Sequence, residues 1–194
     1  MNFRLTKPQI VWLSIFFSVL AATLILDLVT KHLTYYASTR ELIPGVLSIQ
    51  FMRNFGIAFG WFSEGGVVLV IISLLMIIGA LVWYGFIKAK KLKGFGGNRL
   101  LDVGMAFFIG GALGNLIDRI FFGYVRDFIR FDFVNFPIFN FADVFINVGL
   151  IILVIYLFKS INNSDIVKKT QEIDETGETN GENKSKDIGR GEPS

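Results

Sequence analysis

The sequence has 194 residues, of which 53% are hydrophobic and 21 are phenylalanine, and its formal net charge is +3. The apolar residues come in long blocks, and the mean hydropathy of +0.56 excludes an ordinary soluble domain. Cysteine is absent and His32 is the only histidine, which argues against a disulfide framework, a thiolate nucleophile, a histidine-rich metal site and a Ser-His-Asp triad. Basic and aromatic residues do not alternate along a polar surface. We therefore expect no cofactor, no metal and no nucleic-acid partner.

Four segments are long and apolar enough to cross about 30 Å of hydrocarbon, which takes ~20 helical residues. We expect them at 9–27, 66–87, 101–119 and 139–158. The first, "PQIVWLSIFFSVLAATLIL", follows Arg4 and Lys7 as a signal peptide would. Its core is too long for one and lacks a small-x-small site before Asp27, so we interpret it as a retained anchor. Gly110 and Gly114 in the third span have the spacing that lets a neighbouring helix approach closely, although this spacing also arises by chance.

The distribution of basic residues indicates how the spans are oriented. The connection between the second and third spans is rich in them: Lys88, Lys90, Lys91, Lys93 and Arg99. Arg4 and Lys7 precede the first span. Since cytoplasmic loops carry an excess of lysine and arginine, we expect both termini and this connection in the cytoplasm. The bias is incomplete, because other basic residues fall on the opposite side: Lys31, Arg40, Arg53, Arg119, Arg126 and Arg130.

The remaining segments lie outside the spans. The stretch "VLSIQFMRN" alternates, with Leu47, Ile49 and Phe51 on one face and the following set on the other: Ser48, Gln50 and Met52. This period of two predicts a short, half-buried strand at the membrane surface. The composition becomes polar and charged after Lys159, and such a segment cannot form a core. We therefore predict an all-α membrane protein: a four-helix transmembrane bundle (1–159) with a small extracytoplasmic β-element (43–64) and a disordered cytoplasmic tail (160–194).

Polar residues gather near the extracytoplasmic ends of the predicted spans. They are Asp27, Lys31, Asn54, Asn115, Asp118, Arg119, Asp127, Asn140 and Asp143. Two sets of them are spaced by three and four residues, so each set shares one helix face: Asn115, Asp118 and Arg119, and Asn140, Asp143 and Asn147. Two polar faces at the same depth can meet across a helix interface. Because an intramembrane charge costs at least ~2.5 kcal/mol, such a cluster suggests function.

Several of these residues also have a structural interpretation. Asp27 and Lys31 form an acid-then-base pair four residues apart, which is common at helix ends. Asp118 beside Arg119 is suited to a buried ion pair that fastens two elements. Asp102, at the cytoplasmic start of the third span, suits the positive end of the helix dipole, and Arg130 and Asp132 resemble interfacial charges. Two carboxylates remain to which no basic partner is assigned: Asp127 and Asp143.

Two carboxylates without a metal cluster, a thiol or a usable histidine suggest one chemistry. If they lie close together, both cannot be ionised, and the pair holds a single proton. The ionised member can take a proton from a water molecule that attacks an amide carbonyl, while the protonated member donates to the carbonyl oxygen. That chemistry is aspartic peptide hydrolysis. Because the pair titrates as a unit, the sequence does not assign acid and base to Asp127 and Asp143 individually.

Five blocks of sequence resemble the lipoprotein signal peptidase (signal peptidase II) family across residues 8 to 158. In chain order they are "DLVTK", "NFGIAF", "GGALGNLIDR", "VRDF" and "FNFAD". The resemblance implies that Asp127 and Asp143 are the catalytic aspartates of a membrane-embedded aspartic endopeptidase. It further implies a supporting or substrate-binding shell made of Asp27, Lys31, Asn54, Asn115, Asp118, Arg119 and Asn140.

The resemblance also implies a substrate, an inhibitor and a location. Family members cut the signal peptide from bacterial prolipoproteins just before a diacylglyceryl-modified cysteine, at the outer face of the cytoplasmic (inner) membrane. Globomycin, a cyclic peptide, inhibits the family and is expected to occupy the same cleft in contact with membrane lipid. Three residues depart from the usual pattern and affect the shape of the cleft, not its proposed catalytic groups: Ile57, Arg126 and Val144.

Three other functions are possible for such a chain. A proton- or ion-conducting transporter also uses intramembrane acids, but its relay should be staggered through the membrane, whereas these acids stop at one level. A non-catalytic scaffold would pair its carboxylates with Lys31 and Arg119, which leaves Asp127 and Asp143 unexplained. A Ser-Lys peptidase using Lys31 lacks a serine in a recognisable motif.

Overall fold

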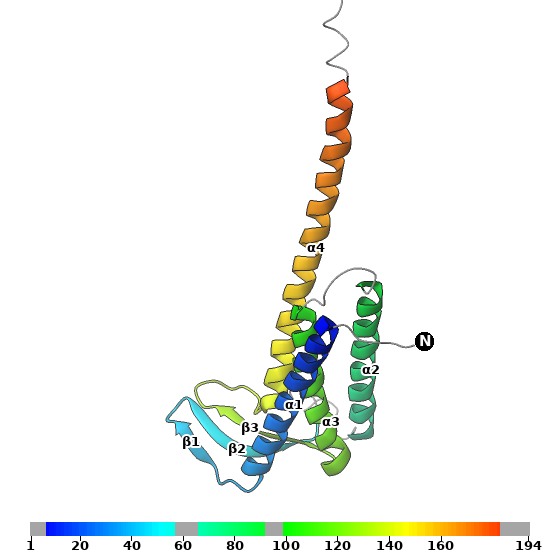
Figure 1. The fold of residues 1–194 in the computed structure, drawn as a ribbon. Helices are drawn as coiled ribbons and strands as arrows, with labels where there is room; N and C mark the ends of the chain where they lie inside the picture. Colours follow the sequence, from blue (N-terminus) through cyan, green and yellow to red (C-terminus); the bar gives the residue numbers. More distant parts are fainter. Residues whose placement is uncertain (1–6, 57–65, 92–98, 183–194) are drawn as a thin grey trace, which may run out of the picture. The chain divides into compact units, whose positions relative to one another are not determined.

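The computed structural model describes residues 7–56, 66–91 and 99–182. Figure 1 shows its elements in chain order: α1 (Lys7–Tyr35), β1 (Arg40–Ile43), β2 (Leu47–Asn54), α2 (Gly66–Lys91), α3 (Arg99–Phe122), β3 (Val125–Phe131) and α4 (Phe141–Glu182). Within the described ranges, four helices are long and apolar enough to cross a membrane, and they are accompanied by one three-stranded sheet. The predicted fold class, a four-helix membrane protein with a small β-element, is confirmed.

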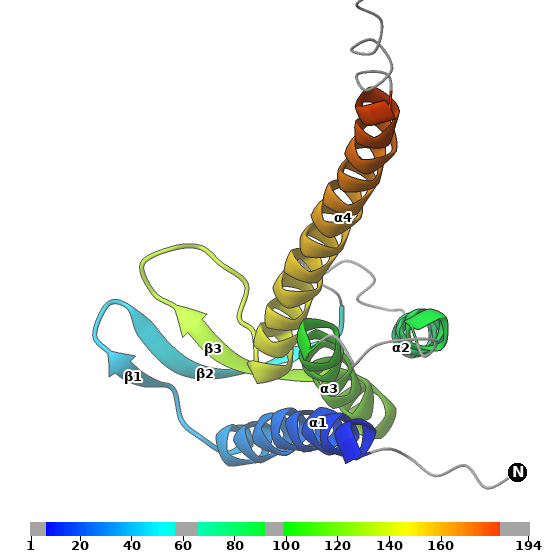
Figure 2. The ribbon, with the colours of Figure 1, turned by 45° about the horizontal axis from the view of Figure 1, so that its top comes forward.

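Helix α3 is the central helix of the bundle. In its most apolar stretch 67% of the residues are buried within the protein, against 17% for α1 and 11% for α2. Viewed from a second angle, α1 and the first part of α4 (141–153) lie beside α3, and α2 stands further out (Figure 2). Lipid tails are as apolar as leucine, so helices in a membrane associate through close packing at small residues. Helix α3 is less apolar than α2 because of the glycines and polar residues that it turns toward its neighbours.

Glycines on two sides of α3 bring the neighbouring helices close. A methyl group added at Gly110 would overlap the Thr23 hydroxyl of α1, and one at Gly114 would overlap the Asp27 carboxylate. A methyl group at Gly111 would overlap the carbonyl oxygen of Ala142 in α4. The close approach predicted for Gly110 and Gly114 is thereby confirmed, and it places a carboxylate of α1 directly against α3.

The first helix is longer than predicted. The sequence predicts its end at Asp27, whereas α1 continues to Tyr35. Lys31 Nζ lies 2.8 Å from Asp27 Oδ2, and both side chains are fully buried. Because the two charges compensate each other one turn apart, the helix carries them in its interior instead of stopping at the first of them.

The three strands form an antiparallel sheet in the order β1-β2-β3. Strand β2 confirms the prediction for "VLSIQFMRN", but burial does not follow the predicted faces: Ser48 is buried and donates a hydrogen bond to Asp132. A register shift between Ile49 and Met52 disturbs the alternation. Strand β3 was not predicted. Residues 57–64 of the predicted β-element, with Ile57, lie outside the described residues.

Helix α4 continues past the predicted start of the tail. Two compact units divide the chain at residues 153 and 154, and α4 extends through 160–182 of the second unit. Lysine, glutamate and glutamine are good helix formers, and residues 160–176 contain no glycine or proline, so composition does not oppose a helix there. The division of the chain at residue 159 and the disorder of the tail stay predictions.

Candidate active site

A tight turn after α3 places strand β3 beside the helix bundle. Gly123 adopts a φ of 77°, in the left-handed region that favours glycine, and its N–H bonds to the Arg119 carbonyl at 3.1 Å. The chain therefore leaves α3 sharply and enters β3, whose third residue is Asp127. Opposite it in the sheet is Met52, and Asn54 pairs with Val125 two residues away. This pairing brings an asparagine of β2 and a carboxylate of β3, far apart in the sequence, to one place.

Asp127 is buried between two asparagine side chains. Asn54 Nδ2 donates to its Oδ2 at 2.8 Å, and Asn140 Nδ2 donates to its Oδ1 at 2.6 Å. The side chain is almost entirely removed from solvent. Burial, followed by the negative charge of Asp143, raises the pKa of Asp127 to about 7, although the two amide donors and Lys31 act in the opposite direction. At neutral pH this carboxyl group is therefore poised between its two protonation states.

Asp143 lies in the first turn of α4 and takes part in the cap of that helix. Its backbone N–H bonds to Asn140 Oδ1 at 3.0 Å, and its Oδ2 accepts from the Asn140 backbone N–H at 3.2 Å. These two bonds form a reciprocal capping box. The second oxygen, Oδ1, accepts from Asn115 Nδ2 at 2.8 Å. A carboxylate at this position also meets the positive end of the helix dipole, which favours a negative charge.

Asn140 connects the two carboxylates. Its side-chain amide donates to Asp127, its backbone N–H donates to Asp143, and it is completely buried. The same amide nitrogen also lies 3.1 Å from Asn115 Oδ1. The structure thus brings Asp127 of β3 and Asp143 of α4 together on one shared residue, as the sequence analysis required of a functional pair.

Four charged side chains form a buried cluster behind the asparagines. Lys31 Nζ lies 2.8 Å from Asp27 Oδ2 and 3.4 Å from Asp118 Oδ2. Asp118 also accepts from Arg126 through Nη2 at 2.7 Å and through the backbone N–H at 2.9 Å. The expected pairing of Asp118 with Arg119 is wrong: successive residues on a helix point in different directions, and Arg126 arrives from β3 instead. The sequence analysis noted Arg126 only as a departure from the family pattern.

Arg119 has a different environment from its neighbour in the sequence. Its Nη1 approaches the Asn115 carbonyl at 3.5 Å, and in the described part of the chain its buried Nε has no hydrogen-bond partner. The charges of Asp143, Asp127 and Asp118 all attract the guanidinium. Arg119 therefore supplies a positive charge near the two carboxylates, and its Nε is a donor that no atom of the described residues accepts from.

The other acids singled out in the sequence lie elsewhere. Asp102 is in the first turn of α3, as expected for a dipole partner, but it also accepts from Tyr84 at 2.8 Å and pairs with Lys88 at 2.5 Å. Arg130 pairs with Asp132 at 3.3 Å near the surface, as expected for interfacial charges. Neither acid contacts the group around Asn140.

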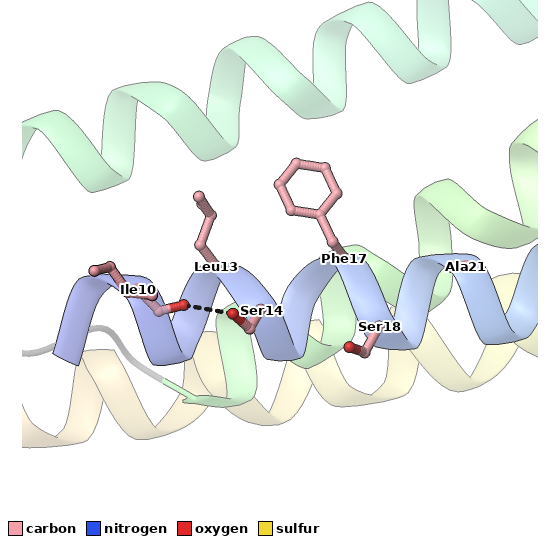
Figure 3. Close-up of a pocket in the computed structure, with 6 residues that line it drawn as sticks. All are labelled: Ile10, Leu13, Ser14, Phe17, Ser18 and Ala21. Atoms are coloured by element: carbon pink, nitrogen blue, oxygen red, sulfur yellow. Dashed lines mark hydrogen bonds between the residues drawn. The ribbon is translucent and has the colours of Figure 1, made fainter. Parts of the chain in front are cut away.

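Two cavities lie apart from the carboxylates. One, of about 500 Å³, runs along α1 and is lined by apolar groups and the hydroxyls of Ser14 and Ser18 (Figure 3). The Ser14 hydroxyl donates to the Ile10 carbonyl at 2.9 Å, so it is already satisfied. The second, of about 470 Å³, is lined partly by Gln50 and Arg130 of the sheet. Neither cavity is lined by Asp127, Asp143 or Asn140. Among the described residues, no three His, Cys, Asp or Glu side chains form a set that could hold a metal ion.

The fold and this site define a class of protein: a multi-pass membrane protein with carboxylates, amides and cations buried at one end of its helices. Two solved structures of a bacterial membrane enzyme share the architecture. One is 31% identical, with a TM-score of 0.67 over 77% of this chain and 91% of its own. The other is 33% identical, with a TM-score of 0.65 over 75% of this chain and 94% of its own.

The sequence comparisons define the family. The model of the family "Signal peptidase (SPase) II" matches residues 19–159. The lipoprotein signal peptidase of Microcystis aeruginosa is 41% identical over 74% of this chain and 91% of its own length. The lipoprotein signal peptidase of Enterococcus faecalis is 38% identical over 75% of this chain and 88% of its own length. The chain therefore belongs to the signal peptidase II family, a family of proteases in bacterial membranes, and the resemblance found in the sequence is confirmed.

Proposed function

We propose that this protein is an aspartic endopeptidase that removes the signal peptide from bacterial prolipoproteins, cleaving before a diacylglyceryl-modified cysteine. Asp127 and Asp143 form the catalytic dyad and activate a water molecule. The observation that carries the proposal is the bridge made by Asn140, which bonds to one oxygen of each carboxylate. The negative charge of Asp143 contributes to the raised pKa of Asp127, which supports an electrostatically coupled pair that holds one proton.

The environments of the two aspartates suggest which one acts as general acid and which one as general base. Asp127, with its pKa raised to about 7 by burial and by Asp143, carries the shared proton in the resting enzyme. We assign the role of base to Asp143, which lies at the positive end of a helix dipole and takes a proton from water. The resulting hydroxide attacks the scissile carbonyl carbon, and Asp127 gives its proton to the carbonyl oxygen.

Collapse of the tetrahedral intermediate completes the reaction. The proton that Asp143 received is delivered to the leaving nitrogen, the C–N bond breaks, and Asp127 recovers its proton from the hydroxyl group of the intermediate. The products are the carboxyl terminus of the signal peptide and the free amine of the lipidated cysteine. No metal ion or cofactor takes part in this scheme.

The way the substrate is anchored explains why the site lies at one end of the bundle. A signal helix and two acyl chains hold the scissile bond at the membrane–water boundary. Cleavage requires local unwinding, and the released amide groups need polar partners. We assign this role to Arg119, whose Nε has no partner among the described residues, and to Asn54, which donates to Asp127. A globomycin-type peptide would compete for the same groups.

The charge distribution supports an extracytoplasmic site with both termini in the cytoplasm. Lys88 and Arg99 lie at the opposite end of the bundle from the sheet, where Arg99 stacks on Trp12 of α1 and Lys88 pairs with Asp102. Positive residues concentrate on the cytoplasmic side of membrane proteins. The end that holds the sheet and Asp127 is then the outer end.

The transporter alternative has less support. A relay needs acids at intermediate depths, but α3 has no acidic residue between Asp102 at one end and Asp118 at the other. Asp102 is also occupied by Lys88 and Tyr84. A membrane-potential-driven proton flux through the purified protein in liposomes would favour the transporter.

Substitution of each aspartate by asparagine tests the proposal. Purified Asp127→Asn and Asp143→Asn enzymes are incubated with a diacylglyceryl-modified prolipoprotein, and release of the signal peptide is measured. Both changes are close to isosteric, so folding should persist while cleavage is lost. Asp132→Asn is the matched control, because Asp132 lies at the end of the same strand and does not contact the site. Cleavage at the wild-type rate by either site variant would refute the dyad.

A further inference from the structure

The side-chain amide of Asn115 has two chemically different ends, and its surroundings determine which end faces which group. Its Oδ1 accepts from Lys31 Nζ at 2.9 Å and from Asn140 Nδ2 at 3.1 Å. Its Nδ2 donates to Asp143 Oδ1 at 2.8 Å. An ammonium group can only donate, so the reverse orientation would place the NH2 group of Asn115 against a cation.

Lys31 is held in place by two carboxylates. It is fully buried, and its ammonium lies between Asp27 at 2.8 Å and Asp118 at 3.4 Å. Asp118 is in turn held by Arg126 through its guanidinium and its backbone N–H. The four residues carry two positive and two negative charges, so the cluster is neutral as a whole and keeps the cation in place.

Helix α1 also holds the backbone next to Asp143. Asp27 Oδ1 accepts from the N–H of Ala142 at 2.9 Å. This N–H belongs to the first turn of α4, where backbone donors have no partner within the helix. Two residues of α1 therefore influence Asp143 indirectly. Lys31 acts on its side chain through Asn115, and Asp27 acts on the neighbouring backbone through Ala142.

We propose that Lys31 is a positioning residue: by donating to Asn115 Oδ1 it turns the Asn115 NH2 group toward Asp143 and so holds that carboxylate for catalysis. This inference rests on the function proposed above. Without Lys31, Asn115 Oδ1 keeps only the longer bond from Asn140 Nδ2, so the amide is held less firmly and Asp143 loses part of its defined orientation. The chemical step should slow, while substrate binding, which does not involve Lys31, should be little changed.

A double-mutant cycle in kinetic constants tests this mechanism. The four proteins are the wild type, Lys31→Met, Asn115→Ala and the double variant, with kcat and KM measured per folded enzyme on a diacylglyceryl-modified prolipoprotein. A hydrogen bond to a charged group corresponds to a loss of roughly 10- to 100-fold in kcat, which we expect for Lys31→Met with KM within about 2-fold. In the Asn115→Ala background, Lys31→Met should change kcat by less than about 3-fold, because Lys31 acts through Asn115.

Lys88→Met is the matched control. Lys88 also pairs with a buried aspartate, Asp102, but at the opposite end of the bundle. This variant should lose stability, as Lys31→Met does, and keep the wild-type kcat per folded molecule. Wild-type kcat in folded Lys31→Met would overturn the proposal. So would losses that multiply in the double variant, since they would show that Lys31 acts independently of Asn115.

If Lys31→Met does not fold, Asp27→Asn becomes the reference background. Asp27→Asn/Lys31→Met removes one charge of each sign and leaves Asp118 balanced by Arg126. It is compared with Asp27→Asn, with and without Asn115→Ala, and the same criteria decide the result. The outcome is separable from the proposed function. Cleavage by Asp127→Asn would refute the dyad, whereas an inactive Asp127→Asn enzyme with a fully active Lys31→Met enzyme would refute only the positioning role.

Discussion

Asn140 combines two functions that one pair of substitutions can separate. Its Oδ1 caps helix α4 by accepting from the Asp143 N–H, and its Nδ2 bonds to Asp127 at 2.6 Å. Serine also accepts at a helix N-cap but has no NH2 group with which to reach Asp127. Asn140→Ser should therefore keep the cap and lose the bridge, while Asn140→Ala should lose both.

The two contributions differ in size and in the measurement that detects them. An N-cap contributes about 1 kcal/mol to stability, so Asn140→Ala should unfold at a lower temperature and Asn140→Ser close to the wild type. A hydrogen bond to a charged group contributes roughly 1.5–3 kcal/mol. Loss of that amount from the transition state corresponds to a fall in kcat on the order of 10- to 100-fold in both variants.

The assay is cleavage of a diacylglyceryl-modified prolipoprotein in detergent micelles, together with thermal unfolding of the same preparations. The wild-type kcat in Asn140→Ser would show that the bridge to Asp127 does not contribute to the reaction. An Asn140→Ser protein as unstable as Asn140→Ala would show instead that the cap is not what Asn140 supplies to the fold.

Three further predictions concern Asp127 and the glycines that position it. Because burial raises the pKa of Asp127 to about 7, the dyad loses its proton as the pH rises through that value, so kcat/KM should decline above about pH 7; a flat profile from pH 6 to 9 would contradict this. Gly114→Ala should lower both stability and activity, because the added methyl group would overlap the Asp27 carboxylate, whereas Gly79→Ala, with open space around it, should be neutral; equal effects would refute the packing argument. Gly123→Ala should destabilise by about 1 kcal/mol, measured by thermal unfolding, because a φ of 77° strains a residue with a side chain; unchanged stability would contradict this.

The spans and the identity of the two carboxylates are predictable from the sequence because each is a local signal. Long apolar runs define the helices, and Asp143 stands out in the last of them, whereas Asp127 is identified by the resemblance of its block "VRDF" to the family. The meeting of Asp127 with Asp143 is also anticipated, because both fall at the same depth. Local patterns do not reveal that Asn140 connects the two carboxylates, through its side-chain amide to Asp127 and its backbone N–H to Asp143.

Two features could not be predicted, for related reasons. Strand β3 reads "VRDFIRF", in which charged residues occur on both faces, so it lacks the period of two that identified β2. Its strand character comes from pairing with β2, more than 70 residues earlier in the chain. The Asp118–Arg126 pair depends on the same turn and the same strand, because Gly123 is needed to bring Arg126 back to α3.

The first turn of α4 is attached twice: to Asn140, the residue that precedes the helix, and to Asp27 of α1. These two attachments limit how the enzyme can adapt to its bilayer. A slip of α4 by a single residue would move Asp143 by 1.5 Å along the axis and rotate it by 100°. Neither attachment would survive such a slip. When the hydrocarbon thickness changes, the protein must therefore compensate by tilting as a whole or at helix ends remote from this turn, and never by sliding α4.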